Sequence, residues 1–542
     1  MKKLRIIAIF LLITVLLSTF VGCSIKYSDE IQKEPSDTPE IGQENTGEAP
    51  GNGNETENGE APENGNETEN GEASGNKPDI VIGDKNLTHK DWDGRAFKVL
   101  SQKGGESSGM NIIDLVGDAE GDTVSKAAYE RNRFIQDTFN VKIDQKEKAD
   151  YYSIIGDVFL SDIGEYDAVK ISITSALRKC QCYVELNFET EYINLSESWW
   201  DQSLLADTAV EGKNYFALGD ISTSDELGTA CIIFDRSLAD NTEGISTAEI
   251  YEAVNNGEWT LECMKLMSAK LENDPNAKGN TLAALEPSDP YKYGAVIVNQ
   301  EFASQYFIDS SGAKSYEYDS EKKRWNTNYM EDGFENVLYE IGEKLLFSSF
   351  SAHNSHFLAA GSLFYDGNIV VDKIYPSIGA DKILFYIGSV YELTRIKNYS
   401  DDLGILPLPK VTETQEVYGG ALHNGVYCYA ISVKAEDYDF SGFMLEALCY
   451  YSSPEHFGDS SLHSAYRKSL LQTVGDSETD MMNLIFGNRR LDIGFNLSFN
   501  KFRYNISEFM TTGSVSSWQA TIALDSLRMD IEFDDWTQGI YD

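Results

Sequence analysis

The sequence predicts an α/β protein built on a mostly parallel sheet. Two observations lead to this fold class. The chain has 542 residues, 41% of them apolar, which is enough for a sizeable core and for two to four domains. Between residues 97 and 171, short apolar strand patterns alternate with helical patterns in the order βαβαβ.

The charge balance excludes one class of function. The chain carries 88 Asp and Glu residues against 44 Lys and Arg residues, a formal net charge of −44. Nucleic-acid binding is excluded, because phosphates need Lys and Arg to release their counterions. Residues 24–80 hold only 15 of the acids, so the remaining body is itself acidic. This acidity mildly favours neutral or cationic ligands over anionic ones.

The N-terminus has the pattern of an export signal over residues 1–22. A basic segment, Met1–Arg5, precedes an apolar run that ends at Gly22. A retained transmembrane anchor is the alternative, since a run of this length approaches what a bilayer needs. Phe20–Cys23 resembles the lipobox of bacterial lipoproteins, although Phe20 replaces the usual Leu. The resemblance implies lipidation of Cys23 and a location on the extracellular face of the cell membrane.

Residues 23–90 are expected to form a disordered acidic linker behind the lipidated N-terminus. The segment is rich in Gly, Asn, Glu and Pro, and the stretch 52–62 recurs over 64–73. A repeat this polar cannot bury a face, so a tether is predicted and not a solenoid.

The globular part begins near residue 91 with alternating elements. Strands are predicted at 97–100, 141–143 and 166–171, and helices at 122–140 and 152–161. Ligands of such folds lie outside the carboxyl ends of the parallel strands. Ser101 and Gln102, in the loop after the first strand, and Ser172, after the third, are therefore candidate ligand-binding residues.

The order of several short stretches resembles extracellular solute-binding lipoproteins of ABC importers. More narrowly, the chain is similar to the carbohydrate-type, family 1-like proteins of clostridia-like bacteria, within the broad group of maltodextrin-binding proteins. The likeness spans residues 95–500. The stretches that carry it are Ser198–Asp201, Val210–Tyr215, Gly219–Ser222, Thr229–Leu238, Gly257–Leu261, Gly361–Phe364, Leu403–Lys410, Leu445–Leu448 and Asp476–Glu478.

This resemblance implies a type II, periplasmic-binding-protein-like fold of two lobes, each a mostly parallel sheet flanked by helices. The prolines at 407 and 409 suit a constrained, non-helical passage between the lobes. Closure of the lobes about a hinge is the expected motion. The implied parts are lobe one from 91–228, a first crossing at 229–235, lobe two from 236–402, a second crossing at 403–409, and a return to lobe one over 410–542 with C-terminal helices on either lobe.

Carbohydrate sites combine flat apolar faces with carboxylates or amides, so aromatic and polar residues near the expected cleft are candidates. Trp199 and Trp200 lie in a polar, loop-like context, but they could equally cover the core of lobe one. Trp259 precedes a helical pattern and is expected to pack there. The further ligand-binding candidates, for which ordinary packing is the alternative, are Asp220, Ser222, Phe364, Tyr365 and Tyr418.

Metal and catalytic patterns are weak. Residues 274–279 are similar to a calcium loop, but Leu285 stands where the loop needs a bidentate acid. His353 and His356 lack the Glu of the zincin pattern. No nucleophile elbow or phosphate-binding loop is present, whereas paired carboxylates are unavoidable with 88 acids. No metal, cofactor or catalytic residue is predicted, and the six cysteines after Cys23 are interpreted as buried free thiols.

The chain is therefore expected to be a monomeric, lipid-anchored receptor without enzymatic activity. It would capture a small polar ligand, with a sugar or oligosaccharide favoured, and deliver it to ABC permease subunits in the membrane. Three alternatives stay open: a sensor that reports ligand occupancy to a kinase, a surface glycosidase, and a purely structural surface protein.

Overall fold

The structure is a computed structural model that describes most of the chain from residue 81 onwards. The described residues are 81–82, 85–86, 90–102, 114–148, 151–187, 189–271, 285–288, 290–297, 300–346, 357–359, 370–423 and 425–541. They all belong to the unit Asn76–Asp542. Cys23, Phe364 and Tyr365 lie outside them. None of the helices in these ranges is long and apolar enough to cross a membrane.

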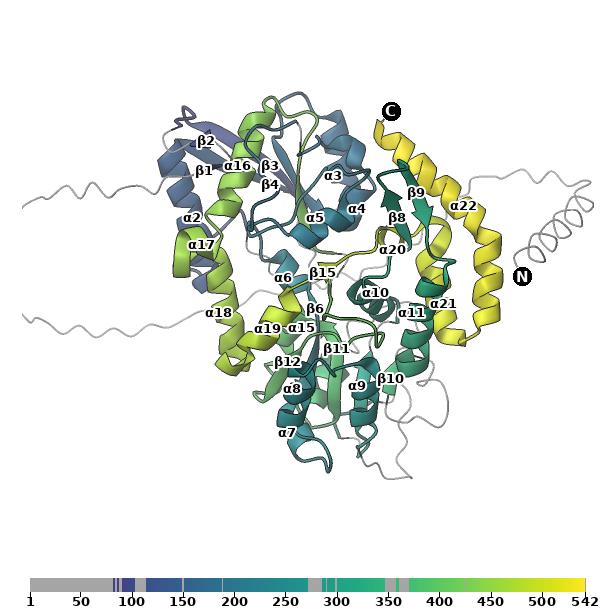
Figure 1. Ribbon diagram of the computed structural model, residues 1–542. Coiled ribbons are helices and arrows are strands. Elements are labelled where there is room, and N and C mark those ends of the chain that lie inside the picture. Colours follow the sequence, from purple (N-terminus) through teal and green to yellow (C-terminus); the bar gives the residue numbers. More distant parts are fainter. Residues whose placement is uncertain are drawn as a thin grey trace, which may run out of the picture. The chain divides into compact units, whose positions relative to one another are not determined.

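Lobe one is built on a four-stranded sheet in the order β14-β5-β3-β4 (Figure 1). β3 pairs in parallel with both β4 and β5, whereas β14 runs antiparallel to β5. Two helices connect the parallel strands, as the sequence predicts. The elements are β3 (Arg95–Gln102), α2 (Thr123–Phe139), β4 (Val141–Lys148), α3 (Tyr151–Leu160), β5 (Ala168–Ser172) and β14 (Tyr427–Ile431).

Local chemistry fixes both ends of α2. The Asp122 carboxylate accepts a hydrogen bond from the Ser125 N–H at 2.8 Å and so caps the amino end. The helix ends at Asn140, whose φ of 49° lies in the left-handed region that asparagine tolerates. Between them, Ile135 and Phe139 are fully buried against the sheet. The predicted helix over 122–140 is thus confirmed.

Lobe two is built on a five-stranded sheet in the order β10-β7-β11-β6-β12. β7 pairs in parallel with β10 and β11, but β6 runs antiparallel to both of its neighbours. This sheet is mixed, which differs from the mostly parallel arrangement expected, because the chain enters the lobe along β6 and leaves it along β12. The strands are β6 (Ala230–Asp235), β7 (Tyr293–Ile297), β10 (Phe357–Ala359), β11 (Ile383–Ser389) and β12 (Leu403–Leu406).

The two expected crossings form neighbouring strands, since Ile233 of β6 lies opposite Ile405 of β12. Gly404 lies so close to the Phe234 ring that a Cβ at this position would overlap it. The Trp259 indole is fully buried and donates its ring N–H to the Pro407 carbonyl at 3.0 Å. The packing role expected for Trp259 is confirmed.

Helices flank the sheet of lobe two, and a hairpin precedes the fifth of them. The helices are α7 (Arg236–Asp240), α8 (Thr247–Asn255), α9 (Leu261–Ser268), α10 (Gln300–Ser311), α11 (Asp332–Ile341), α14 (Tyr375–Ile378) and α15 (Val390–Ile396), and the hairpin strands are β8 (Tyr316–Asp319) and β9 (Arg324–Thr327).

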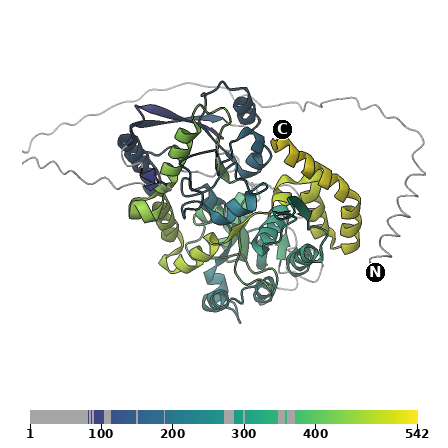
Figure 2. The same cartoon turned by 45° about the horizontal axis from the view of Figure 1, so that its top comes forward.

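The C-terminal segment packs on both lobes. α16 contacts α2 and β14 of lobe one, α18 contacts both α2 and β12, and α21 contacts α10 and α11 of lobe two. Figures 1 and 2 show this run of helices beside both sheets. Its elements are β13 (Gly420–Ala421), α16 (Tyr438–Tyr450), α17 (Pro454–Phe457), α18 (Leu462–Val474), α19 (Thr479–Phe486), β15 (Arg489–Arg490), α20 (Ile493–Leu497), α21 (Phe502–Thr512) and α22 (Val515–Tyr541).

The six cysteines of the described part are free thiols, and all but Cys263 are buried. Burial raises the pKa of the Cys182 thiol to about 11, which keeps it protonated and unreactive. The interpretation as buried free thiols is confirmed for five of them, and Cys263 is half-buried.

Candidate functional site

A cavity of 390 Å³ lies where elements of both lobes meet. α2 of lobe one begins on the side of the sheet where β3 ends, and α15 of lobe two begins directly after the carboxyl end of β11. The cavity therefore lies outside the carboxyl ends of strands from both sheets, the usual ligand position in open α/β folds. Its walls are Asp122, Val124, Thr223, Leu227, Tyr391, Thr394, Arg395, Lys397, Tyr466, Ser469, Leu470 and Thr473.

The amino end of α15 places Tyr391 at the wall. Ser389 donates both its backbone N–H and its hydroxyl to the Glu392 carboxylate, each at 2.6 Å, which closes the first turn. The Val390 N–H donates to the Thr229 carbonyl at 3.0 Å, so this turn is held against the start of β6. The Tyr391 hydroxyl in turn accepts a hydrogen bond from Arg395 at 2.7 Å. The ring is therefore fixed in position without a ligand.

Tyr466 of α18 provides a second aromatic ring to the cavity wall. Its side chain is 6% exposed, and its hydroxyl has no hydrogen-bond partner in the part of the chain that the structure describes. Burial, together with the nearby carboxylates of Glu226 and Asp225, raises the pKa of this phenol, so it remains a neutral donor.

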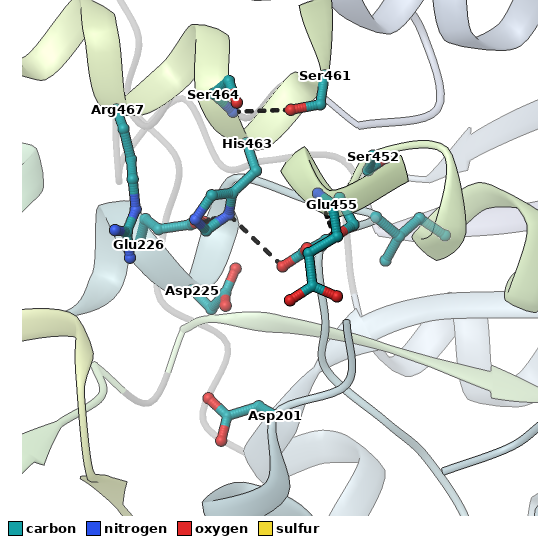
Figure 3. A network of polar contacts seen from close by, with 12 residues as sticks. Asp201, Asp225, Glu226, Ser452, Glu455, Ser461, His463, Ser464 and Arg467 are labelled. Carbon is teal, nitrogen blue, oxygen red and sulfur yellow. Dashed lines mark hydrogen bonds and ion pairs between the residues drawn. The ribbon is translucent and has the colours of Figure 1, made fainter. Parts of the chain in front are cut away.

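The short helix before the first crossing, α6 (Ser224–Gly228), takes part in a buried polar network (Figure 3). His463 of α18 lies 2.7 Å from a Glu226 oxygen and 3.5 Å from an Asp220 oxygen. Arg489 of β15 pairs with Asp201 at 2.6 Å and with Asp225 at 2.8 Å. The network therefore ties α6 to α18 and β15 of the C-terminal segment, and α6 and α18 each also contribute residues to the cavity wall.

The electrostatics of this network favour its ionised pairs. Burial opposes the charge of Glu226, but His463 and Arg489 outweigh it and lower the pKa of that carboxyl to about 2. Burial likewise opposes protonation of His463, yet Glu226 and Asp220 raise its pKa. Burial raises the pKa of Asp220 to about 6, and burial together with the neighbouring Glu226 raises the pKa of Asp225 well above its usual range. These groups hold structure and are not arranged as a free acid and base.

The cavity wall suits binding more than hydrolysis. Glycoside hydrolysis needs two carboxyl groups on either side of the bond that breaks. Among the described residues that line the cavity, Asp122 is the sole acid, and it caps α2. Two aromatic rings surrounded by hydroxyl and charged groups instead match a ligand that has apolar faces and polar edges.

The structure brings only part of the predicted site residues together. Gln102 accepts a hydrogen bond from the Ser172 N–H at 3.2 Å, so these two residues meet at the carboxyl edge of the lobe-one sheet. Ser101 is fully buried. Asp220 and Ser222 lie beside the His463 network, and Ser222 is 5% exposed. None of the described candidates is among the residues that line the 390 Å³ cavity.

The two predicted tryptophans lie in the core of lobe one. Trp199 and Trp200 are 4% and 2% exposed, and both donate their indole N–H groups to the Glu446 carboxyl, at 3.1 and 2.9 Å. Their placement agrees with the alternative interpretation, in which they cover the core. Tyr418 is also buried, and its hydroxyl donates to the Val254 carbonyl at 3.0 Å.

Two residues of the cavity wall, Tyr391 and Tyr466, were missed because both lie within amphipathic helical patterns that resemble ordinary core helices. For Tyr391 a signal was present. The apolar run 383–387 ends at Gly388 and Ser389, so Tyr391 follows the carboxyl end of a strand just as Ser172 does. The same rule, applied to lobe two, predicts it. No comparable signal marks Tyr466.

A second cavity, of 710 Å³, belongs to lobe two alone. Its walls come from α9, α11 and the segment 411–414, and they include Leu266 and Met267. Because none of its described lining residues comes from residues 91–228 of lobe one, closure of that part of lobe one against lobe two would not enclose a ligand there. The 390 Å³ cavity is therefore the better candidate, although it is the smaller.

The structure does not test the two metal-binding patterns that the sequence analysis rejected, the calcium-like loop and the histidine pair. Residues 274–279 and the pair His353 and His356 lie outside the described residues. Within the described ranges, no group of three His, Cys, Asp or Glu side chains is arranged to hold a metal ion.

No protein-family model and no curated protein matches the sequence. Among solved structures, this chain is similar to the sugar-binding protein MalE from Xanthomonas citri. The match covers 80% of this chain and 97% of the MalE chain, with 12% sequence identity and a TM-score of 0.51. The match to the GacH receptor of Streptomyces glaucescens, which was solved unliganded and with acarbose, covers 82% of this chain and 99% of the receptor chain. The sequence identity is 10% and the TM-score is 0.45. The match to maltose-bound MalE3 of T. maritima covers 80% of this chain and 99% of the MalE3 chain, with 10% sequence identity and a TM-score of 0.46.

The likeness to the Xanthomonas citri protein concerns the fold. The chain has the two-lobed architecture of periplasmic binding proteins of type II, and the predicted fold class is confirmed.

Proposed function

We propose that this chain is a solute-binding protein that captures a carbohydrate between its two lobes. The observation that carries the proposal is the 390 Å³ cavity, because its walls come from α2 of lobe one and from α15 of lobe two, the helix that follows the carboxyl end of β11. The shared fold with a sugar-binding protein supports the ligand class. The chain is proposed to bind its ligand without chemical turnover.

Binding follows from the side chains at the wall. The rings of Tyr391 and Tyr466 offer apolar faces for a pyranose, and the hydroxyls of Thr223, Thr394 and Ser469 offer hydrogen bonds for its edge. A sugar that leaves water keeps its hydrogen bonds only if both lobes contribute partners. Closure about the paired strands β6 and β12 is therefore the proposed capture step.

A thermal-shift screen of the full-length chain in detergent tests the ligand class. Monosaccharides, oligosaccharides, amino acids, peptides and polyamines are compared at equal concentration. A ligand at about 100 times its Kd stabilises the native state by about 2.7 kcal/mol, which raises the melting temperature measurably. A shift with a saccharide supports the proposal. A shift with a peptide or polyamine but with no sugar contradicts it, and release of sugar fragments would instead indicate a glycosidase.

We further propose that Cys23 carries a lipid anchor, that the protein works as a monomer on the extracellular face of the membrane, and that it delivers its ligand to ABC permease subunits. The lipobox-like stretch Phe20–Cys23 and the acidic linker support the anchor. Replacement of Cys23 by Ala should move the protein from the detergent phase to the aqueous phase in detergent partitioning. Deletion of the gene should abolish uptake of the labelled saccharide, and unchanged uptake would contradict the transport role.

A further inference from the structure

The 390 Å³ cavity, called the interlobe cavity below, is lined by more basic than acidic side chains, whereas the whole chain has more acidic than basic residues. Three charged side chains line it: one acid, Asp122, and two bases, Arg395 and Lys397. The chain as a whole carries twice as many acids as bases. An excess of basic side chains at the site where a ligand is expected therefore needs an explanation.

Among the described residues, neither base forms an ion pair with a carboxylate, although the charge of Arg395 acts on the nearby Glu392 carboxyl. In the described part of the chain, Arg395 donates to the Tyr391 hydroxyl at 2.7 Å and Lys397 donates to the Thr473 hydroxyl at 3.4 Å, and neither cation forms an ion pair there. Glu392, on the same helix as both, binds Ser389 instead. Other basic residues of this chain, such as Arg489 and Arg490, do have acidic partners.

The one acid at the wall does not offset these bases. The Asp122 carboxylate accepts the Ser125 N–H at 2.8 Å and stands at the amino end of α2, whose macrodipole places partial positive charge there. Its charge is therefore already balanced by the helix that it caps. Two cations without an ion pair among the described residues remain on the α15 side of the cavity.

We propose that the ligand of this cavity is an acidic saccharide, whose carboxylate or sulfate groups are bound by Arg395 and Lys397. The inference rests on the proposed function and names its substrate class. A guanidinium binds a carboxylate or sulfate with two parallel hydrogen bonds, and an ammonium adds a point charge beside it. The sugar ring meanwhile packs on Tyr391, which Arg395 already orients.

The acidity of the whole molecule does not oppose this assignment. At physiological ionic strength the Debye length is about 8 Å, so exposed carboxylates farther away are largely screened. Charges at the cavity wall act over a few ångströms and decide which ligands are bound. The acidic surface slows the approach of an anion but does not abolish its binding.

The experiment compares three oligosaccharides of equal length. One is made of galacturonate, one of neutral galactose and one of sulfated galactose. Calorimetry on the full-length chain in detergent measures the affinity for each. At least one of the two acidic oligomers should bind at least tenfold more tightly than the neutral galactose oligomer. Tighter binding of the galacturonate oligomer indicates a carboxylate ligand, and tighter binding of the sulfated oligomer indicates a sulfate ligand. Added salt should weaken this binding and leave neutral binding unchanged.

Two single variants locate the cations. Arg395→Gln and Lys397→Gln should each weaken binding of the acidic oligomer by at least tenfold. Lys468→Gln, on an exposed position of α18 outside the cavity wall, removes the same charge and should leave affinity unchanged. Because Arg395 also holds Tyr391, Lys397→Gln provides the test that does not disturb the ring.

The outcomes separate this inference from the proposed function. Equal or tighter binding of the neutral oligomer overturns the acidic assignment and leaves the sugar-binding function intact. Tight binding of the acidic oligomer that neither variant weakens also overturns it. Binding of no saccharide at all, neutral or acidic, contradicts the proposed function itself.

Discussion

Tyr391 presents its ring to the interlobe cavity from a position that is fixed on two sides. Arg395 holds its hydroxyl, and the N–H of the preceding residue, Val390, binds the Thr229 carbonyl at the first crossing. A ring so fixed loses little side-chain entropy when a ligand packs on it. The energetic contribution of Tyr391 should therefore come from the face of the ring and not from its hydroxyl.

Replacement of Tyr391 by Ala should weaken binding of the best saccharide by about 10-fold, because the residue is 8% exposed and a ligand can cover only that exposed part of the ring. Tyr391→Phe keeps the ring and should cost less than tenfold. Isothermal titration calorimetry measures both. An unchanged affinity in a folded Tyr391→Ala variant would remove this residue from the site.

Glu446 illustrates how a buried acid couples stability to pH. Its oxygens accept hydrogen bonds from the indoles of Trp199 and Trp200 and from the Asn194 N–H, yet burial outweighs these and raises its pKa to about 8. A group whose pKa is raised on folding stabilises the native state fully below its unfolded pKa. That contribution is lost as the pH rises towards the folded value.

The wild-type chain should therefore lose stability between about pH 4.5 and pH 8 through this residue. Glu446→Gln, which cannot ionise, should show a smaller decrease over the same interval. Melting temperatures of both proteins at pH 5 and pH 8 provide the measurement. Parallel decreases in the two proteins would show that Glu446 does not titrate there.

At the scale of elements, β15 connects the C-terminal segment to the helices next to the first crossing. Arg489 lies between Asp201, which caps α5 (Gln202–Thr208), and Asp225 of α6, and all three side chains are at most 12% exposed. A buried charge that loses its partner destabilises the native state more than the pair ever stabilised it.

Arg489→Leu should accordingly destabilise the protein by about 3–5 kcal/mol, since it leaves two buried carboxylates without their cation. Arg133→Leu serves as the matched control. It removes an arginine that pairs with Glu130 on the exposed side of α2, and it should change stability by less than about 1 kcal/mol. Urea unfolding followed by circular dichroism measures both, and equal effects would contradict the role assigned to Arg489.

The elements differ in how far the sequence predicts them. The strands and helices of the βαβαβ region each bury one face of their own, so the alternation and the periodicity identify them. The mixed character of the lobe-two sheet depends instead on β6 and β12 lying side by side. Ile233 and Ile405, which lie opposite each other in these strands, are 172 positions apart in the sequence, roughly the length of a domain. Periodicity contains no information about such pairing.

The candidate site depends on tertiary structure even more strongly. Its wall joins Asp122, Tyr391 and Tyr466, which come from three distant parts of the chain. Trp199 and Trp200 show the same dependence, because their loop-like context left exposure and core packing equally open, and the Glu446 carboxyl holds both indoles in the core. Likewise, the net charge of the chain favoured neutral or cationic ligands, but the charges at the cavity wall favour anions.

At the scale of the molecule, the proposed capture step requires the two lobes to move as rigid bodies. The two crossings are neighbouring strands of one sheet, so a small change at their ends is enough to rotate one lobe against the other. The cavity wall spans α2 of lobe one and α15 of lobe two, and closure brings these helices together around the ligand. A bound saccharide stabilises the closed state only by its contacts with both lobes.

Spin labels at Arg133→Cys on α2 and Asn398→Cys after α15 should therefore report a shorter distance when the saccharide saturates the protein. Both positions are exposed, and a Cys263→Ser background removes the one cysteine among the described residues that is not buried. Labels at Asn398→Cys and Glu286→Cys, both in lobe two, provide the control and should keep their distance. Pulsed electron spin resonance measures both pairs. An interlobe distance that stays constant while the ligand binds would exclude closure as the capture step, because binding would then take place on a rigid surface.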